Sequence, residues 1–151
     1  MKLIGYARVS SESQEDNTSL SSQRERIAAY CKAFNHELVC VLVEVGSGKN
    51  MIDRPVFNEA LARVASDCDG IIAIKLDRIA RSCKDVLTLV DDILKPKNKS
   101  LILLDLNVDT STPTGKMILT MMAAVAELER EQINERTRLG KEAKKKKGQY
   151  T

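Results

Sequence analysis

A guanidinium and a hydroxyl lie two residues apart near the start of the chain, at Arg8 and Ser10 in YARVS. They follow the apolar residues Leu3 and Ile4 and therefore come at the end of a predicted strand. Side chains two apart in a strand share a face, and open α/β sheets place their sites at the carboxyl edge. The pattern fits a nucleophile beside a cation, and it equally fits a strand whose polar face meets water.

A second charged group follows another apolar run. In KLDRIARS, the side chains of Asp77, Arg78 and Arg81 come directly after GIIAIKL, and the two arginines would be one turn apart if a helix begins there. Arg54, in DRP, is a further guanidinium. A structural cluster would pair each arginine with a carboxylate, whereas a phosphodiester site leaves the guanidinium forks for phosphate oxygens. Four arginines around a hydroxyl would suit displacement at phosphorus.

The elements that must position these groups alternate along the chain. The apolar patterns predict strands at 2–9, 38–45, 70–76 and 100–106, and helices at 20–34, from Pro55 through Val64, and at 86–94. This order predicts an α/β core over residues 1–110, with a mostly parallel sheet of four to five strands flanked by helices.

Residues 111–151 have a different character. Thr112 can cap a helix that begins at Pro113 and continues to about Lys147, roughly 52 Å at 1.5 Å per residue, so it must leave the body. The first half of this helix carries an apolar stripe, which we expect to pack partly on the body and partly on a second subunit: Met117, Ile118, Met121, Met122, Val125 and Leu128.

The end of this helix is basic. Residues 130–147 hold eight basic and three acidic residues, a net charge of +5 in a chain of net charge +3. This asymmetry fits either a polyanion partner or a solvated helix end whose lysines complement the helix dipole. The candidates for phosphate contact are Arg130, Arg136, Arg138, Lys141, Lys144 and Lys145.

Composition argues against several classes of function. No apolar run approaches the roughly 20 residues of a membrane span, and the N-terminus lacks a secretory pattern, so we expect a cytoplasmic protein. Aromatic residues make up only 3% of the chain, which disfavours base stacking. One histidine, His36, and four cysteines without C-x-x-C spacing predict reduced thiols and no metal or other cofactor.

The motifs together resemble a known family. In order and spacing, YARVS, SLSSQR, SGKNMIDRP, KLDRIARS, STPTGKM and ELEREQINERT are similar to the catalytic domain of serine recombinases, the resolvase, invertase and phage-integrase group. The resemblance implies a serine that attacks a DNA phosphodiester, joins the 5′ phosphate and frees a 3′ hydroxyl. It also implies paired double-stranded recombination sites, dimers that form a synaptic tetramer, strand exchange and religation without cofactor, and a bacterial or phage source.

The same resemblance implies residue roles. Ser10 would be the nucleophile, and strand alternation favours it over Ser11, since Ser10 shares a face with Arg8. The other roles follow motif by motif. Arg8, Arg78 and Arg81 would form the phosphate clamp, and Asp77 would orient arginines or move protons. Gln23 would be the glutamine that lies around the active site, Arg54 the arginine of the mobile loop, and Arg130 and Arg136 would reach the active site or the DNA.

One departure limits the match, and two other functions stay open. A resolvase or invertase would continue into a helix-turn-helix, so we expect a catalytic part of a larger protein, most like the large serine integrases and transposon recombinases, with DNA-recognition domains downstream. A metal-dependent nuclease could use Asp77 with Asp67, Asp69 or Glu44. A non-catalytic DNA-binding or assembly module would need only the basic helix.

Overall fold

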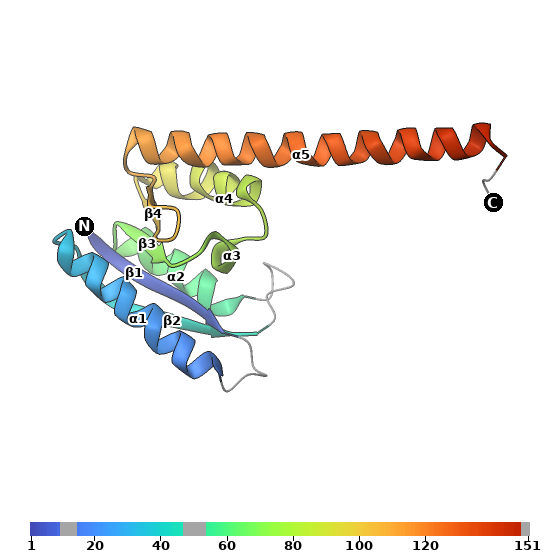
Figure 1. Ribbon diagram of the computed structural model, residues 1–151. Coiled ribbons are helices and arrows are strands. Elements are labelled where there is room, and N and C mark those ends of the chain that lie inside the picture. The colour runs from blue at the N-terminus through green and yellow to red at the C-terminus, as the bar shows by residue number, and fades with distance from the viewer. Residues whose placement is uncertain (10–14, 47–53, 149–151) are drawn as a thin grey trace.

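A twisted five-stranded sheet forms the centre of the molecule (Figure 1). The computed structural model describes residues 1–9, 15–46 and 54–148. The strand order is β2-β1-β3-β4-β5; the first four strands are parallel, and β5 pairs antiparallel to β4. This confirms the predicted, mostly parallel sheet. The strands are β1 (Lys2–Val9), β2 (Glu37–Val45), β3 (Gly70–Ala73), β4 (Ser100–Leu103) and β5 (Val108–Asp109).

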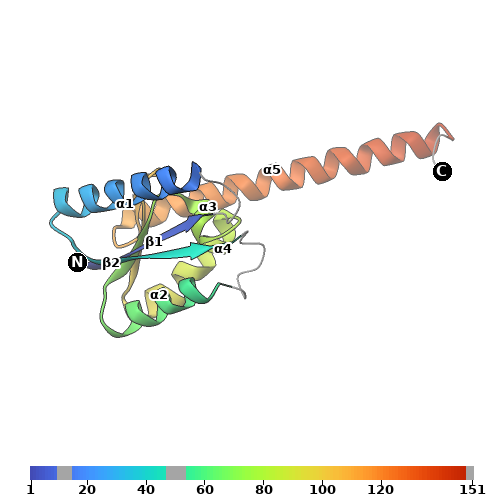
Figure 2. The ribbon, with the colours of Figure 1, turned by 90° about the horizontal axis from the view of Figure 1, so that it is seen from below.

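Helices cover both faces of this sheet (Figure 2). Helix α1 packs on one face, where Ile27 and Cys31 meet Leu3, Ile72 and Ile102. The other face packs against α2, α4, the turn η2 and the start of α5. Because neighbouring strand residues point to opposite faces, β1 contributes to both cores. The helices are α1 (Glu15–Ala33), α2 (Pro55–Ser66), α3 (Leu76–Ile79), α4 (Cys83–Leu89), the π-helical η2 (Val90–Leu94), the 3-10 turn η3 (Lys95–Lys97) and α5 (Pro113–Lys146).

The predicted boundaries were wrong in four places. The predicted strand at 100–106 ends at Leu103. Helix α1 begins at Glu15, five residues before the predicted start. The third strand ends at Ala73, and the polar end of the predicted strand instead turns into α3. The predicted helix 86–94 is α4 followed by η2, and Asn98 closes the segment in a left-handed conformation at φ 57°. Strand β5 has only two residues, too few to give a sequence pattern.

Helix α5 confirms the predicted long C-terminal helix. Pro113 is its first residue, and the Thr112 hydroxyl accepts a hydrogen bond from the Gly115 amide at 3.0 Å. Gly115 and Leu119 are buried against the body. From residue 127 to residue 148 every described residue is exposed, and the helix projects from the body (Figure 1).

The four cysteines are free thiols, as predicted. Cys31 and Cys68 are buried, and burial raises the pKa of both thiols. A thiol with a raised pKa is a weak nucleophile at neutral pH, so these two cysteines act as small apolar core residues.

Candidate active site

The order of the sheet brings the two charged segments together. Strand β1 lies between β2 and β3, with Gly5 opposite Ile72. Because both strands run the same way, the end of β1 lies beside the segment that follows β3. The Arg8 guanidinium reaches across and donates from Nη2 to the backbone carbonyl of Asp77 at 3.1 Å. The proposed convergence of Arg8 with the second charged segment is therefore present.

Asp77 and Arg78 lie on the short helix α3. The Asp77 carboxylate is 3.9 Å from Arg78 Nε, and two-thirds of the Asp77 side chain is exposed. The Arg78 side chain is 30% exposed. A partly exposed guanidinium with one distant carboxylate keeps most of its donors accessible to a ligand.

Arg81 does not share a helix with Arg78, and the predicted one-turn spacing was wrong. Helix α3 ends at Ile79, and Ala80 is extended, with φ −154° and ψ 169°. Ser82 then caps α4, accepting a hydrogen bond from the Asp85 amide at 3.1 Å. Arg81 is therefore exposed in an extended link between two helices.

The predicted nucleophile lies outside the described residues. Ser10 follows Val9, the last residue of β1, and Ser11 is likewise outside. The roles of both stay predictions. Gln23 lies on α1, and its side chain is buried.

Arg54 lies inside the protein rather than beside Arg8. Its residue is 2% exposed, and its guanidinium lies 4.5 Å from the Phe57 ring centroid. Nη1 donates to the Ile79 carbonyl at 2.5 Å, and Nη2 donates to the Arg78 carbonyl at 2.6 Å. The same guanidinium donates to the Tyr6 hydroxyl, at 2.7 Å from Nη2 and 3.3 Å from Nε. In this conformation the fork binds main-chain and phenolic oxygens.

Glu44 supplies the counter-charge. It is 5% exposed, one carboxylate oxygen lies 3.7 Å from Arg54 Nε, and the Tyr6 hydroxyl donates to that oxygen at 2.5 Å. The two oxygens also accept from the amides of Val56 and Phe57 at 3.3 and 3.2 Å, so Glu44 caps the N-terminus of α2 from a neighbouring strand.

This buried contact changes the acidity of Tyr6. Burial and the hydrogen bond to Glu44 raise the pKa of the Tyr6 phenol to about 12. The phenol therefore stays protonated at neutral pH and serves as a donor to Glu44. Sequence reasoning missed this triad of Tyr6, Glu44 and Arg54, apart from assigning Arg54 to the catalytic group.

The acidic residues of the nuclease alternative are dispersed. Glu44 is engaged inside the core, while Asp69 accepts from the Lys2 amide at 2.7 Å, near the start of β1. Within residues 1–9, 15–46 and 54–148 no three His, Cys, Asp or Glu side chains come together as metal ligands would. The same described residues include no helix with the length and apolarity that crossing a bilayer requires.

The apolar stripe of α5 is divided between two surfaces. Leu119, which sequence analysis did not single out, is fully buried, and Ile118 packs partly on the body. In contrast, four side chains of the stripe are more than half exposed: Met117, Met121, Val125 and Leu128. A groove of about 470 Å³ runs along this face and is lined by Cys83, Ile118, Met121, Met122, Val125, Ala126 and Glu129.

The basic half of α5 is fully accessible. All six predicted phosphate-contact residues are exposed on the projecting part of the helix: Arg130, Arg136, Arg138, Lys141, Lys144 and Lys145. Their charges are therefore available to a polyanion.

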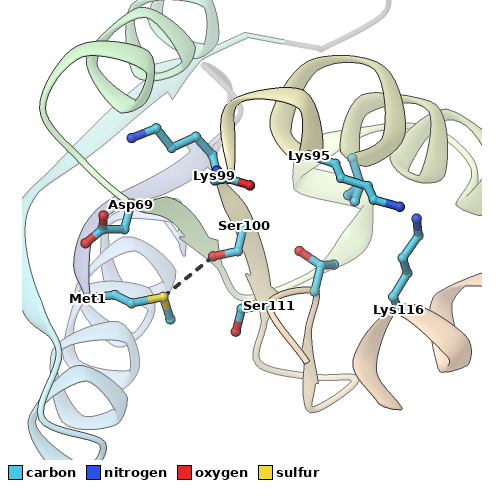
Figure 3. Close-up of a pocket in the computed structure, with 10 residues that line it drawn as sticks. Met1, Asp69, Lys95, Lys99, Ser100, Ser111 and Lys116 are labelled. Carbon is cyan, nitrogen blue, oxygen red and sulfur yellow. Dashed lines mark hydrogen bonds between the residues drawn. The ribbon is translucent and has the colours of Figure 1, made fainter. Parts of the chain in front are cut away.

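A larger hollow, of about 600 Å³, lies on another part of the body (Figure 3). Met1 and Ser100 line it, which places it at the amino-terminal ends of β1 and β4, the sheet edge opposite the charged segments. Lys95 and Lys116 face each other there, and Lys116 binds Asp91 at 2.6 Å. The side-chain hydrogen bond with Lys116, and next the Lys116 charge, lower the pKa of Lys95. This hollow is separate from the candidate active site.

Comparison with known proteins agrees with this geometry. The family model described as Resolvase, N terminal domain, matches residues 3–150. The chain is 38% identical over 147 residues to a probable DNA-invertase of Sinorhizobium fredii, covering 97% of this chain and 44% of that protein. It is 37% identical to the DNA-invertase of Escherichia phage P1, covering 97% of this chain and 72% of the relative.

Solved structures agree as well. The N-terminal catalytic domain of TP901-1 integrase superimposes with a TM-score of 0.70 at 28% identity, over 87% of this chain and 98% of that one. A resolvase-family site-specific recombinase from Streptococcus pneumoniae gives a TM-score of 0.68 at 30% identity, over 97% and 99% of the two chains.

Proposed function

Because the chain belongs to the resolvase family of serine recombinases, we propose that Ser10 cuts DNA by direct attack on a backbone phosphodiester. The Ser10 Oγ loses its proton and bonds to phosphorus, the bond from phosphorus to the 3′ oxygen breaks, and that oxygen is released as a hydroxyl. The 5′ phosphate stays on the serine. Attack by the 3′ hydroxyl of another cut end reverses each step and rejoins the strands.

The contact between Arg8 and α3 is the single observation that carries this mechanism. It joins the end of the strand that precedes Ser10 to the segment that bears Arg78 and Arg81. Charge that develops on the phosphate oxygens in the transition state requires fixed donors, which arginine supplies in pairs. Arg8, Arg78 and Arg81 are the proposed donors.

Asp77 and Gln23 have supporting roles in this proposal. The Asp77 carboxylate lies near Arg78 Nε, where it orients that guanidinium, while its backbone carbonyl holds Arg8. Gln23 stands on α1, which packs on the strand that leads to Ser10.

Helix α5 supplies the partner contacts. Its exposed apolar face, including Met117, Met121 and Val125, fits a second copy of the chain, first in a dimer and then in a synaptic tetramer. Its basic half lies along phosphates of double-stranded DNA near the cut site. The named relatives come from bacteria and phages, which supports action on DNA in the bacterial cytoplasm. The chain covers 44% and 72% of the length of these two relatives, which supports DNA-recognition domains outside residues 1–151.

A covalent-adduct assay tests the chemistry directly. The chain is incubated in EDTA with a pool of nicked duplexes of randomised sequence, since a nick lets the cut strand diffuse away and traps the intermediate. We expect a DNA adduct that survives detergent and heat, with the nucleotide phosphate on Ser10 by peptide mass spectrometry.

The matched controls are the neighbouring serines. Ser10→Ala should form no adduct and should bind DNA as the unaltered chain does, whereas Ser11→Ala should form the adduct normally. An adduct on Ser11, or one that requires a divalent metal, would refute the assignment.

A further inference from the structure

The interior guanidinium of Arg54 is bound to the same short segment that carries the proposed phosphate clamp. Its two hydrogen bonds to α3 end on the carbonyls of Arg78 and Ile79, at 2.6 and 2.5 Å. The Arg78 side chain is 30% exposed, while its own carbonyl accepts from the buried Arg54 guanidinium.

Helix α3 needs such support because it is very short. It has four residues, and its last carbonyls have no partner within the helix. A helix of one turn is not stable by itself. Arg54 supplies both the missing donors and a positive charge at the negative end of the helix. The conformation of α3 therefore depends on where Arg54 is placed.

Tyr6 and Glu44 determine that placement. The Tyr6 hydroxyl accepts from Arg54 and donates to Glu44, whose carboxylate lies 3.7 Å from Arg54 Nε. Tyr6 lies two residues before Arg8 on β1. The same strand therefore provides both the buried hydroxyl that accepts from Arg54 and the guanidinium that donates to α3. The three side chains connect β1, β2 and the start of α2 to α3.

We propose that Tyr6, Glu44 and Arg54 are positioning residues for DNA cleavage, and that Arg54 holds α3 in place instead of binding the scissile phosphate. Arg54 donates to the Arg78 and Ile79 carbonyls, and Arg8 donates to the neighbouring Asp77 carbonyl of the same short helix, so a fixed α3 positions both Arg78 and Arg8. This inference rests on the proposed function, since it assigns a role in the same cleavage step.

The first test removes single contacts and keeps the shape of the core. Tyr6→Phe loses the hydroxyl and Glu44→Gln loses the charge, and Tyr30→Phe on α1 is the control. The substrate is one duplex sequenced from the covalent adducts that the randomised pool gives. Its single-turnover cleavage should slow at least about tenfold in the first two variants and stay unchanged in the control. DNA affinity should change less than about twofold, and amide hydrogen exchange should rise within residues 76–80.

The second test separates positioning from direct phosphate contact. Arg54→Lys and Arg78→Lys are compared on that duplex and on a copy whose scissile phosphate is a neutral methylphosphonate. A residue that binds the phosphate charge matters less on the neutral substrate. The defect of Arg78→Lys should therefore shrink at least about tenfold, whereas the defect of Arg54→Lys should stay within about threefold.

The outcomes distinguish the two proposals. If the unaltered chain forms no Ser10 adduct, the proposed function is refuted, and this inference falls with it. If the adduct forms but Tyr6→Phe and Glu44→Gln cleave at the normal rate, only the positioning role is refuted. If the neutral substrate rescues Arg54→Lys as it rescues Arg78→Lys, Arg54 binds the phosphate directly.

Discussion

Two glycines of α5 should respond in opposite ways to the same substitution. A Cβ built on Gly115 would lie 2.0 Å from the Asp109 carbonyl oxygen and 2.7 and 2.8 Å from its backbone C and N. A Cβ on Gly140 would meet nothing within 4 Å. Because the obstacle at Gly115 is backbone of the edge strand β5, it cannot rotate aside as a side chain would.

The size of the effect follows from these distances. Relieving a 2.0 Å approach requires the start of α5 and β5 to separate by more than 1 Å, which would disturb the burial of Leu119. Overpacking of this kind costs about 3 kcal/mol in the free energy of unfolding. For a chain of 151 residues this corresponds to a fall in Tm of roughly 6–12 °C. Gly140→Ala should instead stabilise the helix locally by up to about 1 kcal/mol, because alanine has the higher helix propensity.

Urea denaturation and far-ultraviolet circular dichroism measure the two effects. Gly115→Ala should lower the urea midpoint, whereas Gly140→Ala should leave the midpoint of the body unchanged or slightly higher and increase the helical signal. A loss below about 1 kcal/mol for Gly115→Ala would mean that α5 does not pack on β5 as closely as described. Equal losses for both variants would show that helix propensity, rather than contact with β5, determines the effect.

Four further expectations concern a cap, a phenol, an ion pair and the basic helix. Thr112→Ala should cost about 1 kcal/mol in chemical denaturation, because the Gly115 amide loses its acceptor, and a null result would contradict the cap. Since burial raises the pKa of Tyr6 to about 12, the folded state favours the protonated phenol, so the free energy of unfolding should fall as pH rises from 10 towards 12. Tyr6→Phe should reduce the dependence of the unfolding free energy on pH in this range. An unchanged dependence would mean that a group other than Tyr6 causes it. Arg26→Ala should cost less than about 1 kcal/mol, an amount that added salt removes, because its ion pair with Asp105 is on the surface. DNA binding by the basic half of α5 should weaken by orders of magnitude between roughly 50 and 200 mM salt, with little sequence preference in filter-binding titrations.

The sequence predicted the elements whose signals are local. Thr112 followed by Pro113 marks a helix start in any context, and the structure has α5 begin there. The apolar run of β1 likewise predicted its observed bounds. Segment 70–76 failed because two apolar residues, Ile74 and Leu76, extend the pattern past the true end of the strand. Periodicity does not distinguish a buried strand from the buried side of a short helix.

The candidate site was likewise predicted only in part. Arg8 and the α3 segment were predicted to meet because parallel strands end at one edge, and this rule needs only the order of elements. The strand order itself was not predicted, and it is this order that makes β1 and β3 neighbours. The buried face of α5 was also missed at Leu119, since the stripe is wide and either edge of it could face the body.

The burial of Arg54 could not be predicted from the sequence around it. An arginine before a helix-starting proline is compatible with an exposed loop, and its burial depends on a counter-charge that lies ten residues away in the sequence. That counter-charge did leave a signal, because Glu44 is the only charged residue between Leu38 and Val45. A carboxylate in an otherwise apolar strand must find donors, since an unpaired buried charge is costly. Arg54, Tyr6 and the first amides of α2 are those donors, and the guanidinium that pairs with Glu44 also donates to the Arg78 and Ile79 carbonyls of α3.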